Sequence, residues 1–399
     1  MPQHSCSVPR PRLEIADIFR RFGRQYRERH LLPLQQLRLM RAIETCRTAA
    51  LGGHVERCNR CGYRRNSYNS CRNRHCPKCQ NTERAAWVQR RKAELLPIQY
   101  FHIVFTIPEQ LNPLALQNKT TLYQILFQAS AQTLLTIAAD PKHLGARIGF
   151  FSVLHTWSQT LLLHPHMHCV VTGGGLKPDG SAWVGCRPGF FLSVRVLSRL
   201  FRRLFLEALQ DAFRNHQLQF HGDLQVLPNH FPALLQELRT KEWVVYAKPP
   251  FGGPQQVVDY LGRYTHRVAI ANPRLEAIQG DKVRFQYKDY RSQDRFKKRH
   301  MTLAADEFMR RFLLHTIPLR FARIRYYGLL SGRNKKRSLA RCKELLNVPD
   351  LPLPSAEEIK KFTTELLALA ALCPHCGQGQ MIRIEVIAAI RFPRQIDSS

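Results

Sequence analysis

The sequence predicts an α+β fold, in which an antiparallel sheet flanked by helices lies between a cysteine-rich N-terminal segment and a basic C-terminal region. Two observations predict it. Apolar, β-branched and aromatic runs alternate with amphipathic helical patterns between residues 95 and 273. Six of the 12 cysteines form Cys-x-x-Cys pairs, which are typical of metal sites in a long cytosolic protein. We expect domains at 1–94, 95–273 and 274–399.

The charge of the chain favours a polyanionic partner. The sequence has 61 Lys and Arg against 29 Asp and Glu, a formal charge of +32, and nucleic acid is the usual partner of so basic a protein. A membrane surface is the competing partner, but no run approaches the ~18 apolar residues of a spanning helix, and the N-terminus lacks the apolar core of a signal peptide. We therefore expect a soluble, cytoplasmic, nucleoid-associated protein with no membrane partner.

The N-terminal segment combines two helical patterns, at 13–26 and 34–50, with a cysteine-rich stretch. Cys58-x2-Cys61 and Cys76-x2-Cys79 are separated by 14 residues, and four thiolates at this spacing can close a tetrahedral zinc site. The sequence therefore predicts structural Zn²⁺ on these four cysteines. Cys71 and His75 lie between the pairs and are alternative ligands, either in place of a paired cysteine or in a second site.

The middle of the chain predicts a strand at 99–106, a helix at 113–139, two adjacent strands at 148–157 and 160–172, and a basic amphipathic helix at 193–215. The second of the adjacent strands carries His164, His166 and His168. Because side chains alternate along a strand, the three imidazoles share one face, and Met167 and Cys169 face the other way.

Clustered imidazoles on one strand indicate a metal site, since imidazole is the commonest protein ligand for metals. The three glycines that end this run, at 173–175, favour the same interpretation. The alternative is a core strand with hydrogen-bonded histidines. Pro165 cannot donate a ladder hydrogen bond, so it is expected at a strand start, an edge or a bulge.

Tyr260 and Tyr264 are four residues apart in a helical pattern that begins near Pro254, so both hydroxyls lie on one face. The same spacing is also common in a core stripe. Gly262 is unfavourable in a helix by roughly 1 kcal/mol relative to Ala, which suggests a close approach. Arg263 and Arg267 crowd this turn and suit a site that handles phosphate.

The C-terminal region predicts a hairpin around 277–287 and a strongly basic stretch. Between residues 282 and 343 there are nineteen Lys and Arg against four Asp and Glu. Aromatic residues are interleaved with them, a combination typical of single-stranded nucleic-acid binding: Phe285, Tyr287, Tyr290, Phe296, Phe321, Tyr326 and Tyr327. With Arg263 and Arg267, the predicted DNA contacts are Lys297, Lys298 and Arg299.

A further pair, Cys373 and Cys376, has no partner nearby in the sequence. Cys342, Cys6 or His375 would complete a metal site with it, and a reduced, metal-free pair is an equal alternative. The chain shows no phosphate-binding loop of the Gly-x4-Gly-Lys-Ser/Thr type.

These residues together suggest a chemistry. An imidazole pair can hold Mg²⁺ or Mn²⁺ against a phosphate oxygen and neutralise the charge that develops during attack on a phosphodiester. A tyrosine hydroxyl can be the attacking group if the metal and nearby cations assist it. The product is a 5′-phosphotyrosine and a free 3′-OH, and two tyrosines permit two consecutive strand transfers.

Three motifs, in order along the chain, carry a resemblance to a known family: YNSCRNRHCPKCQ at 68–80, HPHMHCVVTGGGL at 164–176 and YLGRYTHRVAIANPRL at 260–275. The chain resembles the IS91 family of insertion-sequence transposases, the two-tyrosine branch of the HUH endonucleases. HIVFTIP at 102–108 and RYYGLL at 325–330 extend the resemblance over most of the chain.

The resemblance implies an HUH-type nuclease domain after an N-terminal zinc-binding module, and rolling-circle transposition by nicking and strand transfer of single-stranded DNA. It implies His166 and His168 as ligands of Mg²⁺ or Mn²⁺, and Tyr260 and Tyr264 as nucleophiles. Gln159 is the expected third ligand, with His164 and His155 as rivals. The implied partners are single-stranded DNA at the element ends and target, a host helicase, and further copies of the chain.

The sequence is compatible with three alternative functions. A plasmid replication initiator or relaxase would use the same chemistry. A non-catalytic, zinc-dependent DNA-binding regulator would use the histidines only structurally. A hydrolytic zinc site is the poorest of the three, because it requires neither paired phenols nor a large positive charge.

Overall fold

The computed structural model describes residues 13–79, 94–189, 191–248, 256–257, 268–289, 298–332, 334–348, 357 and 372–390. Tyr260 and Tyr264 lie outside these ranges, as do the predicted DNA contacts Arg263, Arg267 and Lys297. The chain divides into two compact units. The first is drawn from residues 1–87, 266–316 and 354–399, and the second from residues 88–265 and 317–353.

The second unit is built on one antiparallel sheet. Its strands lie in the order β11 (Ile324–Gly328), β4 (Arg147–Trp157), β5 (Leu163–Leu176), β3 (Tyr100–Thr106), β7 (Val245–Lys248), and β6 (Trp183–Gly185) pairs with β5. Every pair in this sheet is antiparallel. The prediction of an antiparallel sheet is therefore confirmed.

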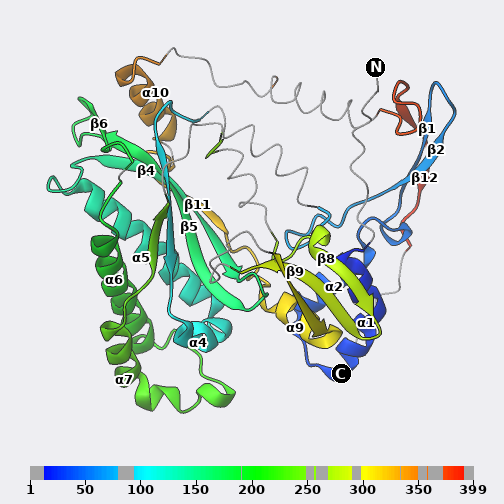
Figure 1. The fold of residues 1–399 in the computed structure, drawn as a ribbon, viewed down its shortest axis with the longest axis horizontal. Coiled ribbons are helices and arrows are strands. Elements are labelled where there is room, and N and C mark those ends of the chain that lie inside the picture. The colour runs from blue at the N-terminus through cyan, green and yellow to red at the C-terminus, as the bar shows by residue number, and fades with distance from the viewer. Residues whose placement is uncertain are drawn as a thin grey trace. The chain divides into compact units, whose positions relative to one another are not determined.

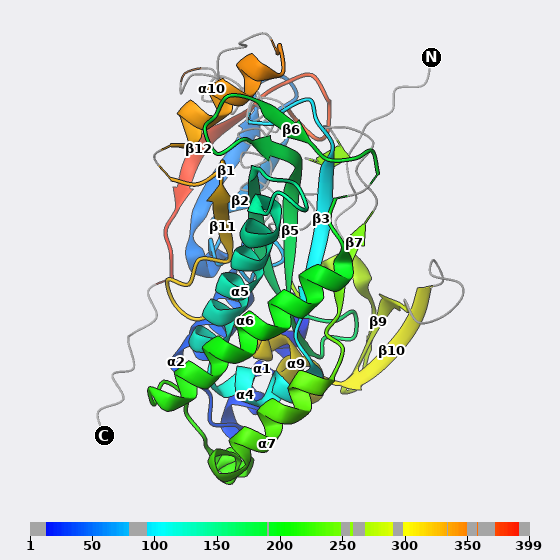
Figure 2. The ribbon, with the colours of Figure 1, turned by 90° about the vertical axis from the view of Figure 1, so that its left-hand side faces the viewer.

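Helices cover one face of this sheet. Figures 1 and 2 agree in placing α5, α6 and α7 on the same side of the strands. Phe101, Phe105 and Phe150 from the strands enter a continuous core with Phe127 of α5 and Phe201 of α6. The helices of this unit are α4 (Asn112–Gln117), α5 (Lys119–Ala139), α6 (Val194–Arg214), α7 (Leu227–Thr240) and α10 (Lys335–Leu345).

The two faces of β5 have different roles, as the alternation of its side chains predicts. Met167, Cys169 and Val171 are fully buried in the core beneath the helices. His166 and His168 project from the opposite face, and both are half-buried. Pro165 lies near the start of β5, where the register with β4 shifts between His155 and Trp157. The expected position of this proline is therefore confirmed.

The glycines at 173–175 have a packing role that differs from our expectation. A Cβ atom on Gly173 would lie 2.7 Å from the backbone oxygen of Gln99, and one on Gly175 would lie 2.3 Å from that of Arg147. Gly174 has a φ of +154° and the same crowding against Val184. These glycines let neighbouring strands approach β5 at the end remote from its histidines, and they give no support to a metal site.

The first unit combines helices with two three-stranded antiparallel sheets. Helix α1 packs against α9, and the rings of Phe19 and Phe312 meet edge to face at 5.4 Å. The helices are α1 (Ile15–Arg29), α2 (Leu34–Thr45) and α9 (Ala305–Leu314). One sheet has the order β10 (Lys298–Ala304), β9 (Lys282–Lys288), β8 (Leu275–Gln279), and the other has the order β12 (Met381–Ile387), β1 (Gly53–Cys58), β2 (Arg64–Tyr68).

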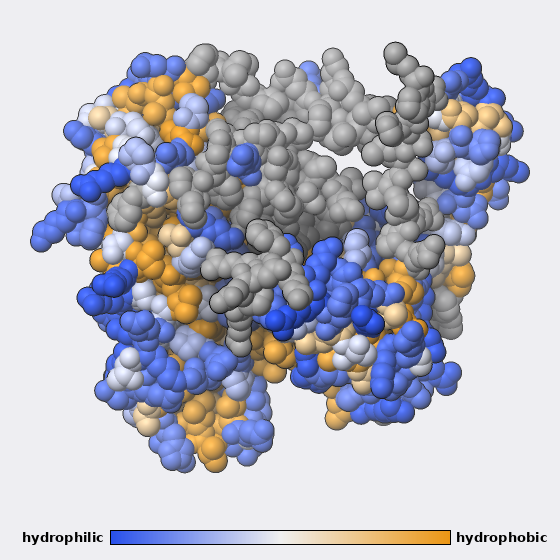
Figure 3. Space-filling model, in the orientation of Figure 1, coloured by the Kyte–Doolittle hydropathy of each residue, from blue (hydrophilic) through white to orange (hydrophobic). Residues whose placement is uncertain are grey.

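Short 3₁₀ turns complete the described secondary structure: η1 (Ala49–Leu51), η2 (Glu109–Leu111), η3 (Gly222–Leu224) and η4 (Asn272–Arg274). The described surface seen in Figure 3 is mostly hydrophilic. Of the helices in the described ranges, none is both long and apolar enough to span a bilayer.

The two units cross the domain boundaries that we predicted at residues 94 and 273. Strand β11 and helix α10 come from the expected C-terminal region, yet β11 is an edge strand of the large sheet. Strands β8 to β10 and helix α9 belong instead to the unit that contains the N-terminus. The described elements of the C-terminal segment are thus divided between the two units.

Several aromatic residues that we expected to stack on DNA bases belong to the protein core. Phe285 is fully buried and packs against Phe308 at 5.8 Å. Tyr327 stacks on Phe150 at 5.0 Å across the β11–β4 pair. Tyr290 and Phe296 lie outside the described residues. Phe285 and Tyr327 therefore pack inside the two different units and are not available to stack on DNA bases.

Candidate functional site

Three histidines meet on the face of the sheet opposite α5 and α6. His155 comes from β4, and His166 and His168 come from β5, where His155 and His166 are cross-strand partners. One ring nitrogen from each of the three lies within 4.8 Å of the others. His155 is only 2% exposed. Two rigid neighbouring strands therefore hold three imidazoles in a group of the size that one metal ion requires.

Hydrogen bonds at Nδ1 orient two of these rings. His166 Nδ1 donates to the backbone oxygen of His164 at 2.6 Å, since a carbonyl can only accept. His168 Nδ1 lies 2.8 Å from Nε2 of His102 on β3. In the tautomer in which His168 donates, both rings would ligate a metal through Nε2. Fixing a ring through its second nitrogen in this way is characteristic of metal-ligating histidines.

The surroundings keep the imidazoles of His102 and His168 neutral at neutral pH. Burial, with smaller contributions from Lys248 and His166, lowers the pKa of His102 to about 3. Burial, followed by the charges of neighbouring histidines, holds the pKa of His168 well below its ordinary value. A neutral imidazole offers the lone pair that a metal needs, so His168 does not have to lose a proton at neutral pH before it binds a cation.

The predicted third ligand, Gln159, lies in the turn between β4 and β5. Of the histidines, cysteines and acidic residues in the described ranges, the one grouped with His166 and His168 is its rival His155, and Gln159 stays a prediction. His164, the other rival, contributes its backbone oxygen to the orientation of His166. His102 was not among the candidates. His102 was visible within the HIVFTIP strand, but only the sheet order places that strand beside β5.

The predicted DNA contacts Lys298 and Arg299 begin β10, in the first unit, and both side chains are exposed. The guanidinium of Arg299 forms an ion pair with Asp289 at 3.2 Å. The arginine is exposed and the aspartate is half-buried, so the ion pair is accessible to a competing phosphate.

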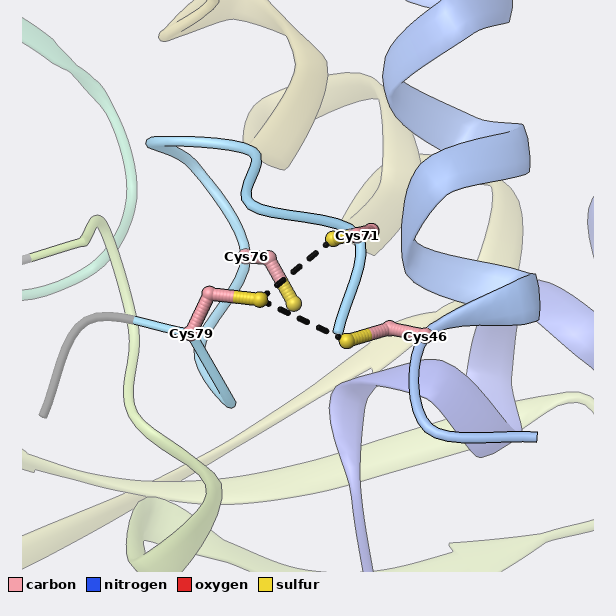
Figure 4. Close-up of side chains that lie close together, drawn as sticks. All are labelled: Cys46, Cys71, Cys76 and Cys79. Atoms are coloured by element: carbon pink, nitrogen blue, oxygen red, sulfur yellow. Dashed lines mark hydrogen bonds between the residues drawn. The ribbon is translucent and has the colours of Figure 1, made fainter. Parts of the chain in front are cut away.

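The cysteines of the first unit form two separate groups of four. The first contains Cys46, Cys71, Cys76 and Cys79, and Figure 4 shows their sulfur atoms pointing toward one another. Cys46 caps the end of α2, and the other three come from the loop after β2. The Sγ atoms of Cys46 and Cys71 each lie 3.5 Å from that of Cys79. Tetrahedral zinc with bonds of about 2.3 Å separates its sulfur ligands by about 3.8 Å.

This grouping replaces the single zinc site that we predicted on Cys58, Cys61, Cys76 and Cys79. The two pairs belong to different groups, because Cys58 and Cys61 lie with Cys373 and Cys376. Cys71, an alternative from the sequence, is a member of the first group, whereas Cys46 was missed because it belongs to no Cys-x-x-Cys pair. The partners expected for Cys373, namely Cys342, Cys6 and His375, are likewise replaced by Cys58 and Cys61.

The first cysteine group has the electrostatics of a cation site. Hydrogen bonding from the thiol of Cys71 lowers the pKa of Cys46 to about 2, while the pKa of Cys71 rises to about 12 because Cys46 holds the negative charge. The pKa of the Cys76 thiol is also raised by Cys46 and Cys71. One thiolate therefore forms readily and opposes the ionisation of its neighbours, and a divalent cation removes this conflict.

The fold and its sites define a metal-binding α+β protein. Its net positive charge of +32 suits a nucleic-acid partner. Two family descriptions match the chain: "Transposase zinc-binding domain" over residues 18–107 and "Putative transposase" over residues 149–338. The first range contains the whole Cys46 group, and the second contains the histidine cluster. The zinc-binding match and the four-cysteine group within it support structural Zn²⁺ in the first unit.

Two relatives match nearly the full length. The chain is 58% identical over 388 residues to the putative transposase y4qJ of Sinorhizobium fredii, covering 95% of this chain and 97% of that protein. It is 28% identical over 373 residues to the transposase for insertion sequence element IS801 of Pseudomonas savastanoi pv. phaseolicola, covering 87% and 86%. The chain therefore belongs to the IS91 family of insertion-sequence transposases. No solved structure matches it significantly.

Proposed function

We propose that this transposase nicks and rejoins single-stranded DNA at a divalent metal ion held by His155, His166 and His168, through 5′-phosphotyrosine intermediates in rolling-circle transposition. The observation that carries the proposal is the meeting of three imidazoles from β4 and β5 on the face of the sheet opposite α5 and α6. In this proposal the second unit acts as an HUH-type nuclease domain.

The donor set favours Mn²⁺ over Mg²⁺. Imidazole nitrogen suits transition metals, whereas Mg²⁺ prefers oxygen ligands and retains water. Within the described residues, the cluster consists of three histidines and includes no carboxylate. A divalent ion bound there would neutralise charge on a non-bridging phosphate oxygen. The neutral ligands leave the full positive charge of the ion available to the phosphodiester.

The covalent step uses Tyr260 or Tyr264, which lie outside the described residues. The phenol oxygen attacks the phosphorus atom and transfers its proton to water. The bond from phosphorus to the 3′ bridging oxygen breaks, and that oxygen takes up a proton. The products are a 5′-phosphotyrosine and a free 3′-OH, which can reverse the reaction on another strand without ATP. Each transfer conserves the number of phosphodiester-type bonds.

Positive charge in the second unit supports a path for the DNA backbone. Arg147, Arg337 and Arg341 line a cavity of about 370 Å³ between the start of β4 and α10. Arg147 and His155 are eight residues apart on β4, which corresponds to roughly 26 Å along a strand. Phosphates engaged at the arginines and at the histidines would therefore belong to one extended strand of several nucleotides.

A covalent adduct tests the tyrosine assignment. In the presence of Mn²⁺, the wild-type protein is expected to form a denaturation-resistant adduct with a single-stranded oligonucleotide from the element end that is labelled at its 3′ end or internally on the 3′ side of the nick. The Tyr260→Phe/Tyr264→Phe variant should form none, because neither position has an attacking oxygen. Tyr287→Phe, on β9, is the matched control and should retain the adduct. An adduct that persists in the double variant would refute the assignment.

A second prediction concerns His102 as a positioning residue. His102→Leu removes the acceptor for His168 Nδ1 and is expected to weaken Mn²⁺ binding about 10- to 100-fold, the usual effect of losing such a partner. His102→Gln retains an acceptor oxygen and should recover part of the affinity. The measurement is the electron paramagnetic resonance signal of unbound Mn²⁺ during titration. His143→Leu, at an exposed loop position, is the control. Equal affinity in the Leu variant and the wild type would exclude this role.

The alternatives predict different results. A replication initiator or relaxase would form the same adduct but on plasmid origin DNA, and membership of a transposase family argues against it. A non-catalytic zinc-dependent regulator would bind DNA without cleaving it in Mn²⁺ or Mg²⁺. Binding without any adduct on element-end oligonucleotides would therefore favour the regulator.

A further inference from the structure

The first unit contains a sequence repeat that connects the two ends of the chain. Cys58-Asn-Arg-Cys61-Gly62 and Cys373-Pro-His-Cys376-Gly377 share the pattern Cys-x-x-Cys-Gly. The Sγ atoms of Cys58 and Cys376 are 3.7 Å apart, although these residues are separated by 318 positions. The Sγ atoms of Cys61 and Cys373 are 3.6 Å apart. All four sulfurs lie within 4.8 Å of one another.

Both motifs fold in the same way. The N–H of Gly62 donates to the carbonyl of Cys58 at 3.2 Å, and that of Gly377 donates to the carbonyl of Cys373 at 2.9 Å. Both glycines are left-handed, with φ of +72° and +65°, a conformation that favours glycine. The two turns therefore present their cysteines as a matched pair of knuckles.

Backbone N–H groups surround the sulfur atoms. Cys58 Sγ accepts from the N–H groups of Arg60 and Cys61, both at 3.4 Å. Cys376 Sγ accepts from the N–H of Gly379 at 3.3 Å. Donors of this kind stabilise thiolate ligands, as the outer partners of metal sites do. A Cβ atom on Gly379 would lie 2.3 Å from Cys58 Sγ, so only glycine allows this approach.

The strands next to these knuckles have little core of their own. β12 pairs with β1 from Gly53↔Ile387 to Cys58↔Met381, yet the interior residues of β12 are exposed, and Val386 is 74% exposed. A three-stranded sheet with so little buried apolar surface needs another source of stability. A structural metal supplies it in small domains that cannot build a core.

We propose that Cys58, Cys61, Cys373 and Cys376 form a second structural zinc site, which fastens the C-terminal strand β12 to the N-terminal hairpin of β1 and β2. The sulfur separations fit tetrahedral zinc, whose ligand sulfurs are about 3.8 Å apart, and exceed the roughly 2.05 Å of a disulfide. Cys373 and Cys376 lie outside the zinc-binding range matched at 18–107. The site is independent of the proposed DNA chemistry.

Zinc content of the full-length protein tests the proposal. Mass spectrometry of the metals in purified wild-type protein is expected to give two zinc ions per chain, one from each cysteine group. Cys373→Ser/Cys376→Ser should retain one. Cys58→Ser/Cys61→Ser, at the other end of the chain, should also retain one, and the quadruple variant should retain that same ion because the two pairs share a site. Cys186→Ser, outside both groups, is the control and should retain two.

The zinc ion that the Cys-to-Ser variants retain in the Cys46 group also shows that the rest of the first unit is folded. Limited proteolysis should release the segment after residue 357 faster in Cys373→Ser/Cys376→Ser than in the Cys186→Ser control, because β12 has lost its fastening. Two zinc ions in the Cys373→Ser/Cys376→Ser variant would overturn the proposal. A quadruple variant with no zinc, or iron in place of zinc in the wild type, would do so as well.

Discussion

Replacing His166 with alanine is expected to lower the rate of DNA cleavage about a thousandfold and to leave single-stranded DNA binding near the wild-type value. A bound divalent ion supplies several kcal/mol of charge stabilisation at a phosphoryl oxygen, and each 1.4 kcal/mol corresponds to a factor of ten in rate. With only His155 and His168 remaining from the cluster, the ion would bind weakly. The measurement is the initial rate of cleavage of a labelled oligonucleotide at fixed Mn²⁺, with binding followed by fluorescence anisotropy.

The position of His166 makes this test specific. Its side chain is half-buried on the face opposite the core, so truncation removes a ligand without opening a cavity among Met167 and its neighbours. His143→Ala, at an exposed position, removes an imidazole elsewhere and should cleave at the wild-type rate. Cleavage by the His166→Ala variant at the wild-type rate, or an equal loss in both variants, would contradict a metal role for the histidine cluster.

The histidine face was predictable because it follows from one local rule. Alternation along a strand fixes which side chains share a face once the strand itself is recognised. Apolar residues at 167, 169 and 171 mark the core side, and the histidines then fall on the other side. The alternation of side chains does not predict the order of strands in the sheet, however. The positions of His155 on β4 and His102 on β3 beside β5 therefore emerged only from the sheet.

The cysteine groups show the limit of spacing as a guide. Two Cys-x-x-Cys pairs close together in the sequence favour one site, because a short connecting loop is easily closed. The structure instead pairs Cys58 and Cys61 with a motif more than three hundred residues away, and strand pairing between β1 and β12 brings the two together. The glycine that follows Cys61 and Cys376, but does not follow Cys79, was the available sequence signal for this partnership.

The basic C-terminal stretch shows a different limit. Its aromatics were consistent with base stacking or with burial, and composition alone does not separate the two. Tyr326 and Tyr327 lie on β11, where they contact Phe151 and Phe150 of β4. Aromatic pairs across neighbouring strands stabilise a sheet. The arginines of the same stretch remain candidates for phosphate contact, because the burial of the aromatic residues does not bury the arginines.

Replacing Cys46 with serine is expected to remove one zinc ion per chain and to unfold the cysteine-rich part of the first unit. Structural zinc contributes about 10–16 kcal/mol to small zinc-dependent domains, which is comparable to the roughly 5–15 kcal/mol of total stability typical of a whole domain. Cys46 is the only member of its group that comes from α2. Its loss therefore also detaches the loop that carries Cys71, Cys76 and Cys79 from that helix.

The Cys46→Ser variant distinguishes the two cysteine groups of the structure from the single zinc site that the sequence spacing favours. A single site on Cys58, Cys61, Cys76 and Cys79 would make Cys46→Ser silent, whereas the two groups in the structure make it as damaging as Cys76→Ser. Metal analysis and thermal unfolding of Cys46→Ser, Cys76→Ser and the control Cys186→Ser measure this directly. Full zinc content and an unchanged unfolding transition in Cys46→Ser would restore the single-site arrangement, because a thiol outside the ligand set contributes nothing to zinc affinity.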